Sequence, residues 1–487
     1  MSTQPEMIQH DQIFVGGEFV HPSTSNQIEV ISPNTEEVFG RVPDAGPADI
    51  DRAVAAARDA FDNGPFPRMK PEERSELLTR FSQAIQKRAQ DLAHLISSQN
   101  GCPIQHSFPV QVMTASMVLD TYADIAKTYP FEETRAGSMG GQVLVRQHPV
   151  GVCAGILPWN VPMFIMSMKV GPALAAGCTM VLKAAPETPL DAYLLAEAVK
   201  EAGLPPGVIN IVAAGREGSE YLVRHPDVDK VSFTGSSGTG SLVGSICGEQ
   251  IKRCTLELGG KSAAVVLDDA DYAKAIPGLI GAGLLNNGQA CLATTRILVS
   301  REKHDDLVEA LAAAASSMPV GNALDPETQI GPVVAERQRD KIEGLLAAGR
   351  DEGATAACGG GRPAGVDRGW FIEPTIFGGV ENSMRIAREE IFGPVLSVIP
   401  YANEEEAIAI ANDSPFGLSG AVWGEDTDRA VQIASQIRTG TVGINGGSSL
   451  DFRAPFGGFK RSGLGRELGP EGLEAYTEYQ SIIHAAG

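Results

Sequence analysis

From residue 150 onward the chain alternates short apolar runs with segments of helical periodicity, and this alternation limits the folds available to it. Five apolar runs lie between residues 151 and 260: "GVCAGIL", "CTMVLK", "GVINIVAA", "KVSFTG" and "CTLELGG". Helical segments begin between them, near Pro162, Pro189, Arg216 and Ser237. Strands that alternate with helices form right-handed crossovers in a parallel sheet that is buried on both faces. The sequence therefore predicts an α/β fold, whose first unit has the size of a dinucleotide-binding unit and ends near residue 259.

The same alternation returns after residue 260 and predicts a second α/β unit. Apolar runs such as "AAVVLDDAD", "TTRILVS", "PTIFGGV" and "PVLSVIPY" alternate there with helical segments such as residues 301–318 and 403–414. Near the N-terminus, "IFVGGEFV" predicts a hairpin with a Gly-Gly turn, and amphipathic helices are expected over residues 47–61 and 71–100.

Two further segments are expected to form strands outside these units. Residues 130–149 resemble a strand pair with Gly140-Gly141 as its turn, and residues 473–487 end the chain as a strand-like tail. An apolar terminal strand exposes an unprotected edge unless it pairs with something. We therefore hypothesise that the tail pairs with another subunit.

Composition and charge exclude several classes of protein. The net charge of −21 over 487 residues argues against nucleic acid as a partner. The seven cysteines form no C-x-x-C pair, which fits a reducing compartment, and "MSTQPEMIQHDQ" lacks the features of a signal peptide, so we expect a cytoplasmic protein. Residues 147–168 carry no Asp, Glu, Lys or Arg but contain three prolines, and we interpret them as a buried strand, a loop and a helix start rather than a membrane span.

Four motifs carry residue types suited to chemistry, although each has an ordinary structural alternative. "FTGSSGTG" (233–240) stands where a strand passes to a helix; its glycines permit close backbone approach and the helix start favours a phosphate, yet it also fits an ordinary turn. Asn160 in "ILPWNVP" could donate to an oxyanion or simply cap a loop.

The other two motifs hold a carboxylate and a thiol. Glu257 in "LELGGKS" stands between leucines, where an apolar setting raises a carboxyl pKa and suits a general base, unless it points outward from its strand. Cys291 in "NNGQACLATTR" is either a core thiol or a nucleophile, which would need an activating setting of N–H groups or charges.

The order and spacing of these motifs resemble those of the NAD(P)-dependent aldehyde dehydrogenase family over essentially the whole chain. The motifs that carry the resemblance, in the family's order, are "ILPWNVP", "GPALAAGCTMVLK", "GLPPGVINIV", "FTGSSGTG", "LELGGKS", "NNGQAC", "EEIFGPV", "SPFGLSGAV" and "PFGGFKRSGLGRELG". Glu257 and Cys291 lie 34 residues apart, which matches as well. The resemblance implies an NAD(P)-binding domain of residues 1–125 and 150–259, a catalytic domain of residues 260–472, and oligomerisation strands at 126–149 and 473–487. It also implies a homodimer or homotetramer.

The resemblance assigns roles in the oxidation of an aldehyde to a carboxylic acid. Cys291 matches the nucleophile, Asn160 the oxyanion donor and Glu257 the base that activates a hydrolytic water, while Lys169 and Glu467 match residues that assist proton movement and positioning. An intact Glu257 favours hydrolysis over the alternative of a coenzyme A-acylating enzyme. A non-catalytic protein that retains the fold is the alternative from another class.

The cofactor implied is NAD, with NADP possible. The residues that match the family's cofactor contacts are Ile156, Pro158, Trp159, Lys183, Pro186, Glu187, Gly215, Phe233, Thr234, Gly235, Ser236, Leu258, Gly259, Glu390 and Phe392. Many NAD-preferring members carry a glutamate three residues after the lysine, where this chain has Pro186 with Glu187 next to it. This departure leaves the choice between NAD and NADP open.

The substrate pocket expected from the resemblance is apolar. Its residues by position are Val161, Ile165, Met168, Ala290, Leu292, Leu450 and Phe456. Because no cation stands among them to bind a carboxylate or phosphate, we predict an uncharged, hydrophobic aldehyde. The eight histidines show no metal-ligand spacing such as H-x-x-x-H, so no metal is expected.

Overall fold

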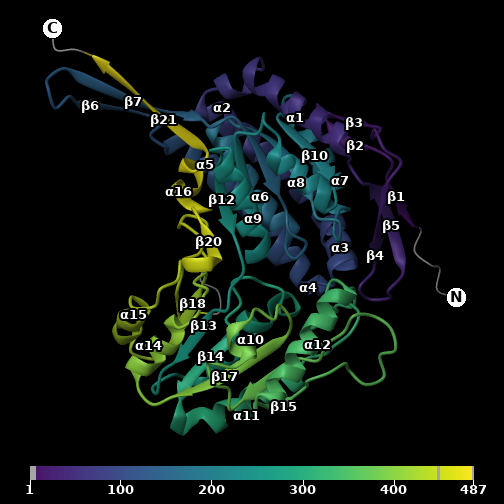
Figure 1. Cartoon of the computed structure of the whole chain (residues 1–487), viewed down its shortest axis with the longest axis vertical. Helices are drawn as coiled ribbons and strands as arrows, with labels where there is room; N and C mark the ends of the chain where they lie inside the picture. Colours follow the sequence, from purple (N-terminus) through teal and green to yellow (C-terminus); the bar gives the residue numbers. More distant parts are fainter. Residues whose placement is uncertain (1–6, 447–449, 485–487) are drawn as a thin grey trace.

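The computed structural model describes residues 7–446 and 450–484. Two large sheets dominate it, one in the upper part of the molecule and one in the lower part (Figure 1). The upper sheet joins strands in the order β20 (Gly463–Leu464), β12 (Arg253–Glu257), β11 (Lys230–Thr234), β8 (Val152–Ile156), β9 (Thr179–Ala184), β10 (Ile209–Ala213), β2 (Ile13–Val15) and β3 (Glu18–Val20). The strands β12 to β10 are parallel, which confirms the five strands predicted between residues 151 and 260.

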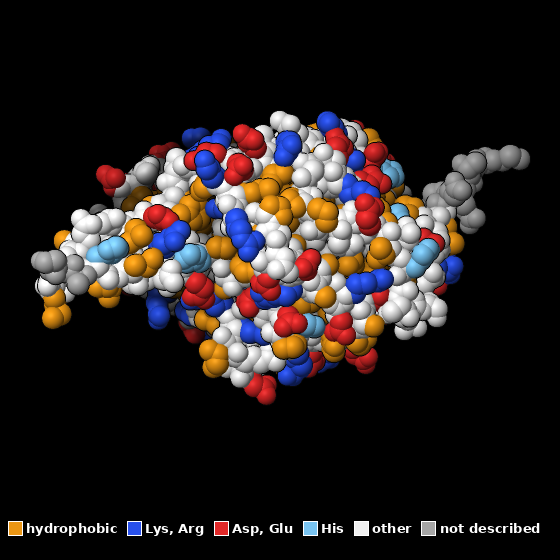
Figure 2. Space-filling model, turned by 90° about the horizontal axis from the view of Figure 1, so that it is seen from above, with side chains coloured by type: hydrophobic (Ala, Val, Ile, Leu, Met, Phe, Trp, Pro, Cys, Tyr) orange, Lys and Arg blue, Asp and Glu red, His pale blue; other side chains and the backbone are white. Residues whose placement is uncertain are grey.

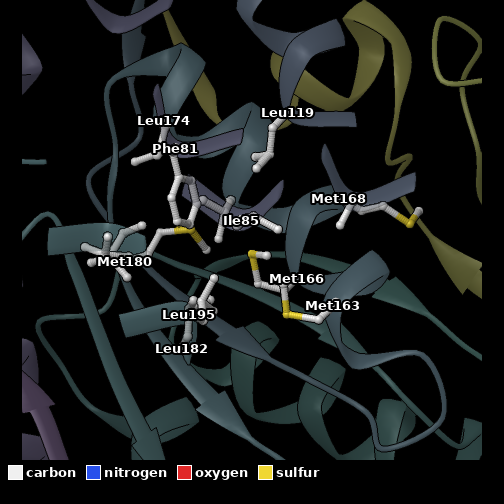
Figure 3. Packing of buried hydrophobic residues seen from close by; sticks show 14 of the residues in the cluster. Phe81, Ile85, Leu119, Met163, Met166, Met168, Leu174, Met180, Leu182 and Leu195 are labelled. Atoms are coloured by element: carbon white, nitrogen blue, oxygen red, sulfur yellow. The ribbon is translucent and has the colours of Figure 1, made fainter. Parts of the chain in front are cut away.

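Helices cover both faces of this upper sheet, as the continuous burial of its strands requires. One face packs against α1 (Pro47–Asp62), α8 (Arg216–Arg224) and α9 (Ser237–Glu249). The other packs against α2 (Pro71–Lys87), α3 (Ala89–Asn100), α5 (Thr114–Thr128), α6 (Pro162–Ala176) and α7 (Asp191–Ala202). Figure 3 shows the second core, where Phe81 of α2, Leu119 of α5 and Met166 of α6 lie in one cluster with Met180 and Leu182 of β9.

The prediction of a single helix over residues 71–100 is wrong in one respect. The helix is interrupted at Arg88, which separates α2 from α3. Arg88 leaves helical geometry (φ −103°, ψ 10°) and its guanidinium pairs with Glu197 and Glu201 of α7. The break coincides with this tertiary contact, and no glycine or proline stands there. Between α3 and α5 the chain adds the short α4 (Ile104–His106) and a π-helix, η2 (Ser107–Met113).

The lower sheet is the second predicted α/β unit. Its strand order is β15 (Thr355–Cys358), β16 (Thr375–Gly378), β17 (Val395–Tyr401), β14 (Arg296–Ser300), β13 (Ala263–Val266), β18 (Gly420–Trp423) and β19 (Gly443–Ile444). All neighbouring pairs are parallel except β15 with β16. The helices of this part are α10 (Tyr272–Leu284), α11 (His304–Ser316), α12 (Glu336–Asp351), α13 (Arg385–Arg388), α14 (Glu404–Asn412) and α15 (Thr427–Ala434).

A small antiparallel sheet extends from the upper part as an arm (Figure 1). It joins β6 (Glu132–Ala136), β7 (Gln142–Pro149) and β21 (Thr477–His484), with Gly140 and Gly141 in the left-handed turn between β6 and β7, as predicted. The terminal strand β21 pairs along its full length with β7 of its own chain, so an intramolecular partner covers one of its edges. Residues 485–487 of the expected tail lie outside the described residues.

The remaining elements complete the connections. A second small sheet joins β1 (Ile8–Gln9), β5 (Val38–Pro43) and β4 (Gln27–Ile31), and α16 (Gly469–Glu474) leads from the lower part back to the arm. Residues 147–168 form the end of β7, the buried β8 and the start of α6, as interpreted from the sequence. In the described part of the chain, no helix is long and apolar enough to cross a membrane.

Candidate active site

A cleft of about 790 Å³ opens at the carboxyl ends of the five parallel strands of the upper sheet. Ligands of open α/β sheets bind at this edge. All the residues that the sequence assigned to the cofactor line the cleft: Ile156, Pro158, Trp159, Lys183, Pro186, Glu187, Gly215, Phe233, Thr234, Gly235, Ser236, Leu258, Gly259, Glu390 and Phe392. Asn160, Ile165 and Cys291 line it too, so the thiol and the predicted cofactor residues share one space.

The middle of the cleft fits a pyrophosphate. Strand β11 ends at Thr234, and α9 begins after Ser236, whose hydroxyl accepts from the Thr239 N–H (3.3 Å) at the helix N-terminus. No acidic residue stands in the first turn of α9, so its free N–H groups and dipole favour an anion. A Cβ on Gly235 would lie 2.6 Å from the Phe233 ring, which explains why this turn needs glycine.

One end of the cleft is built around Lys183 at the end of β9. Burial lowers the pKa of Lys183 to about 8, while the carboxylate of Glu187 opposes that shift. Pro186 offers no carboxylate here, and Glu187 forms an ion pair with Arg337 of α12. The cleft residues contributed by α12 (Arg337, Gln338 and Lys341) and by the start of α8 (Arg216, Ser219 and Glu220) were missed by sequence reasoning, because no motif marks them.

At the other end, Glu390 and Phe392 approach the strand ends from the lower part of the molecule. The N–H of Gly260 donates to Oε1 of Glu390 (2.9 Å), and burial raises the pKa of this carboxyl. Phe392 adopts a left-handed conformation (φ 59°) and packs edge-on against Trp159, with ring centroids 5.4 Å apart. A strained non-glycine residue at a cleft is held there by its surroundings.

Cys291 follows a strained loop that is fixed on several sides. Asn286, Asn287 and Gly288 of η3 (Leu285–Gly288) are all left-handed. The Asn287 amide donates to the carbonyls of Gly101 and Pro332 (2.8 and 2.9 Å) and accepts from the Gly331 N–H (2.7 Å). The loop therefore holds the partly buried thiol in place at the end of the cleft near Glu390.

The electrostatics around Cys291 keep the thiol protonated in this structure. Burial raises the pKa of Cys291 to about 12, with further contributions from the carboxylates of Glu390 and Glu257. The main-chain N–H groups of Leu292 and Cys291 oppose this shift. These N–H groups stabilise the thiolate when it forms.

Asn160 follows β8 and lies beside the Cys291 loop. Its Nδ2 donates to the carbonyl of Gln289 (2.9 Å), which leaves a second amide N–H for an oxyanion. Its own carbonyl accepts from Nδ2 of Asn100 (2.8 Å) and of Asn286 (3.0 Å). Asn160 is therefore held at both its backbone and its side chain.

Glu257, at the end of β12, lies outside the cleft lining, as do Lys169, Glu467 and the predicted substrate residues other than Ile165. Its carboxylate is buried, and neither oxygen has a hydrogen-bond partner among the described residues. A Cβ on Gly457 would lie 2.7 Å from Oε1, so the carboxylate is turned toward Gly457. Burial, together with the nearby Glu467, raises the pKa of Glu257 well above its ordinary value.

Lys169 and Glu467 form a buried ion pair behind the strand ends. Nζ of Lys169 donates to Oε1 of Glu467 (2.8 Å), and it also contacts the hydroxyls of Ser232 (3.1 Å) and Thr234 (2.8 Å). Both charged side chains are almost fully buried. The structure thus brings together these two residues, which the sequence analysis linked only through the resemblance.

The predicted substrate residues lie in and against the apolar core next to Cys291. Met168 and Phe456 are buried in this core, and Val161, Leu292 and Leu450 are partly buried against it, as is Cys291. Ala290 is also partly buried, and Ile165 lines the cleft itself. Phe164 and Phe452, whose ring centroids lie 6.2 Å apart, belong to the same core.

Comparisons with known proteins match this geometry. The family model of the aldehyde dehydrogenase family matches residues 19–482. The chain is 48% identical to geranial dehydrogenase of Castellaniella defragrans, covering 98% of this chain and 99% of that protein. It is 41% identical to the human mitochondrial aldehyde dehydrogenase, covering 98% of this chain and 92% of that one.

Solved structures agree with these sequence matches. A Mycobacterium tuberculosis aldehyde dehydrogenase complexed with NAD+ superposes with a TM-score of 0.97 at 48% identity, over 99% of both chains. Aldehyde dehydrogenase C of Pseudomonas syringae, complexed with NAD+ and octanal, gives a TM-score of 0.94 at 41% identity, over 99% of this chain and 97% of that one. The chain belongs to the aldehyde dehydrogenase family, and it is an oxidoreductase that oxidises aldehydes to carboxylic acids with NAD(P)+ as the hydride acceptor.

Proposed function

We propose that Cys291 is the nucleophile, Asn160 the oxyanion donor and Glu257 the general base of this oxidation. The observation that carries the proposal is the single cleft that holds Cys291, Asn160 and every predicted cofactor residue. A Cys291→Ala variant should form no NAD(P)H from an aldehyde while it still binds the cofactor. Turnover at the parent rate in that variant would refute the assignment.

The first half of the reaction takes place on Cys291. The thiolate adds to the aldehyde carbonyl, and the new oxyanion accepts from Nδ2 of Asn160 and from main-chain N–H groups beside the thiol. The bound NAD(P)+ supplies a hydride acceptor and a positive charge next to the thiol. Loss of the hydride from the thiohemiacetal leaves a thioester on Cys291.

The second half hydrolyses this thioester. Glu257 takes a proton from a water molecule, the hydroxide adds to the thioester carbonyl, and the thiolate of Cys291 leaves with the electron pair of the C–S bond. Because the carboxylate is turned toward Gly457, it must rotate toward the thioester before it acts. A Glu257→Gln variant should release one NAD(P)H per active site and then stop.

The proposed substrate is an uncharged, hydrophobic aldehyde. The residues around Cys291 on the side of α6 are apolar, and the relatives include proteins named for geranial and crystallised with octanal. The kcat/KM for octanal or geranial should exceed that for succinic semialdehyde. A preference for the anionic semialdehyde would overturn the substrate class.

Hydrolysis is proposed over transfer of the acyl group to coenzyme A, because Glu257 is available to activate water. Addition of coenzyme A should not raise the rate of NADH formation. An acyl-coenzyme A product would favour the alternative.

We propose a homodimer or homotetramer built through the arm, with the domain boundaries given by the resemblance. The arm carries three exposed apolar side chains, Met139, Tyr479 and Ile483. Seen from above, it projects from a surface on which charged and apolar side chains are interspersed (Figure 2). Sedimentation velocity of the parent and of Ile483→Lys tests this, since the substitution should lower the mass. A cytoplasmic location and the absence of a metal remain predictions.

A further inference from the structure

Two cysteines on neighbouring elements of the upper part face each other beside the cleft. Cys247 lies in the last turn of α9, and Cys254 is the second residue of β12. Cys247 is buried in the core under α1, α8 and α9, and Cys254 is partly buried against the same core. Both are free thiols, and the reaction proposed above uses neither. We call these two residues the thiol pair.

The packing of α9 against β12 sets the position of the pair. A Cβ on Gly240 would lie 2.3 Å from the Leu258 side chain. One turn further along the helix, a Cβ on Gly244 would lie 3.3 Å from the Leu256 side chain. The helix therefore runs back along the strand, and the next residues on the two facing sides are the members of the thiol pair. Over this span the helix rises about 10.5 Å and the strand about 13 Å, so the two members stay opposite each other.

The connection between the two cysteines is a tight reversal of the chain. The Lys252 N–H donates to the Cys247 carbonyl (2.8 Å), which returns the chain to the end of α9 just before Cys254. Ile251 takes a left-handed conformation (φ 58°) to make this turn. A disulfide forms without backbone movement only between residues of facing elements whose Cβ atoms point toward each other. The reversal and the facing register give the thiol pair this arrangement.

The two thiols differ in reactivity. A hydrogen bond with the Cys247 thiol, together with the Lys230 amine, lowers the pKa of Cys254 to about 7 against the effect of burial. The same hydrogen bond, and then burial, raises the pKa of Cys247. The thiolate is the form of cysteine that oxidants attack. Cys254 is therefore the thiol that reacts first, with Cys247 in contact to complete a disulfide.

Solvent reaches the pair from the Cys254 side. Within the described residues, β20 pairs with the outer edge of β12 only at Leu256 and Glu257, and Cys254 is partly exposed. The upper sheet holds a second pair of hydrogen-bonded thiols, Cys153 and Cys178, and both of these are fully buried. Access to solvent therefore separates the thiol pair from the other two cysteines.

We propose that the thiol pair is an oxidative modification site, where a peroxide joins Cys247 and Cys254 in a disulfide that weakens cofactor binding. The Cys254 thiolate attacks one oxygen of hydrogen peroxide, so that an S–O bond forms and the O–O bond breaks. The hydroxide that leaves takes up the proton that Cys254 released and becomes water.

The second step closes the disulfide. The Cys247 sulfur attacks the sulfur of the Cys254 sulfenic acid, so that the S–S bond forms and the S–O bond breaks. The hydroxide that leaves takes the proton of the Cys247 thiol and becomes a second water. The two thiols lose two electrons in total, and the peroxide gains them.

Helix α9 connects this site to the cleft. Its residues Leu242, Val243 and Ile246 line the cleft, and Ile246 directly precedes Cys247. The disulfide draws the two sulfur atoms to about 2.05 Å and fixes the end of α9 to β12, which moves this wall of the cleft. The effect on the cofactor rests on its proposed placement in the cleft, whereas formation of the disulfide does not.

The test treats the full-length Cys291→Ala protein with hydrogen peroxide, because peroxide would otherwise also oxidise the proposed nucleophile. Mass spectrometry without reduction should show the loss of two hydrogen atoms and a peptide that links Cys247 to Cys254. The Kd for NADH, from fluorescence titration, should rise about threefold or more. Dithiothreitol should restore both the mass and the Kd.

Two further variants in the same background provide the controls. Cys247→Ser removes the resolving thiol, so Cys254 should gain one or two oxygen atoms and form no disulfide. Cys358→Ser is the matched control, because Cys358 is also partly buried but its thiol donates to the Pro374 carbonyl (3.7 Å). It should form the disulfide as the parent does.

The outcomes separate this proposal from the proposed function. Absence of the link between Cys247 and Cys254, whether or not Cys254 is oxidised, would overturn the modification site. A link with a Kd for NADH within about twofold of the untreated protein would overturn its effect on the cofactor. If untreated Cys291→Ala fails to bind NADH, the proposed function fails, and the peptide map still decides the modification site.

Discussion

Replacement of Asn160 by alanine separates the chemical role of its amide from its structural role. Among the described residues, the side chain makes one hydrogen bond, from Nδ2 to the Gln289 carbonyl at 2.9 Å. The main chain of Asn160 is held independently, because Asn100 and Asn286 donate to its carbonyl. Asn160→Ala should therefore leave the loop in place and remove only the amide.

The two losses differ in size. Loss of one hydrogen bond costs about 0.5–1.5 kcal/mol of stability, and here less, since Asn286 also donates weakly to the Gln289 carbonyl (3.4 Å). Loss of an oxyanion donor costs about 10²–10³ in kcat, equivalent to about 2.7–4 kcal/mol of transition-state stabilisation. The expected result is a large fall in kcat with a small shift in the urea midpoint.

The assay follows NADH absorbance with octanal at saturating NAD+, alongside urea unfolding by circular dichroism. Asn100→Ala is the control, because it removes a donor to the same loop without touching the amide, and its loss should fall mainly on stability. A kcat for Asn160→Ala within fivefold of the parent, or a rise in KM alone, would refute the oxyanion role. So would equal kcat losses in the two variants.

Further changes test the electrostatics of the site. Because burial and two carboxylates raise the pKa of Cys291 to about 12, iodoacetamide should alkylate the cofactor-free thiol slowly at pH 7 and faster as the pH rises, measured by mass spectrometry. Lys169→Met leaves the Glu467 carboxylate buried without its cation and should cost about 3–5 kcal/mol in urea unfolding, whereas a loss below 1 kcal/mol would contradict the buried pair. Pro186→Glu should lower kcat/KM for NADP+ at least about tenfold, because the new carboxylate repels a 2′-phosphate, and should leave kcat/KM for NAD+ unchanged. Equal losses with the two cofactors would count against a position of residue 186 beside the 2′-phosphate. Burial lowers the pKa of Lys183 to about 8, so its positive charge is present below pH 8 and lost above it. The KM for NADP+ should therefore rise as the pH passes 8 in the parent. In Lys183→Met the KM should not change over this pH range.

The position of the cleft was predictable because the strand ends coincide with motifs. In a parallel sheet the carboxyl ends of all strands meet at one edge, so the residues after β8, β9, β11 and β12 had to converge. The signal is local: an apolar run followed by glycine or a polar residue. The strand pattern predicts that "ILPWN", "VLKAAPE", "FTGSS" and "LELGG" lie at one edge, whereas their roles in binding a cofactor came from the family resemblance.

Features that depend on packing between distant segments were not predictable. The interruption of the helix at Arg88 is associated with carboxylates of α7 that lie more than a hundred residues away in the sequence. The apolar periodicity of residues 71–100 does not indicate it. Arg337 and Lys341 reach the cleft from a helix whose sequence is typical of a solvated surface. The orientation of Glu257 likewise depends on the space that Gly457 leaves open.

In the proposed mechanism the two halves of the reaction place opposite demands on Glu257, and its buried carboxyl can meet both only if its proton moves. A charged Glu257 raises the pKa of Cys291 and so opposes formation of the thiolate. Burial raises the pKa of Glu257 well above its ordinary value, which favours its neutral form while the thiol attacks. Hydrolysis then requires the carboxylate, so the proton must leave between the two steps. Glu467, which raises the pKa of Glu257, and Lys169, which lowers it, are charged groups that set how readily this proton leaves.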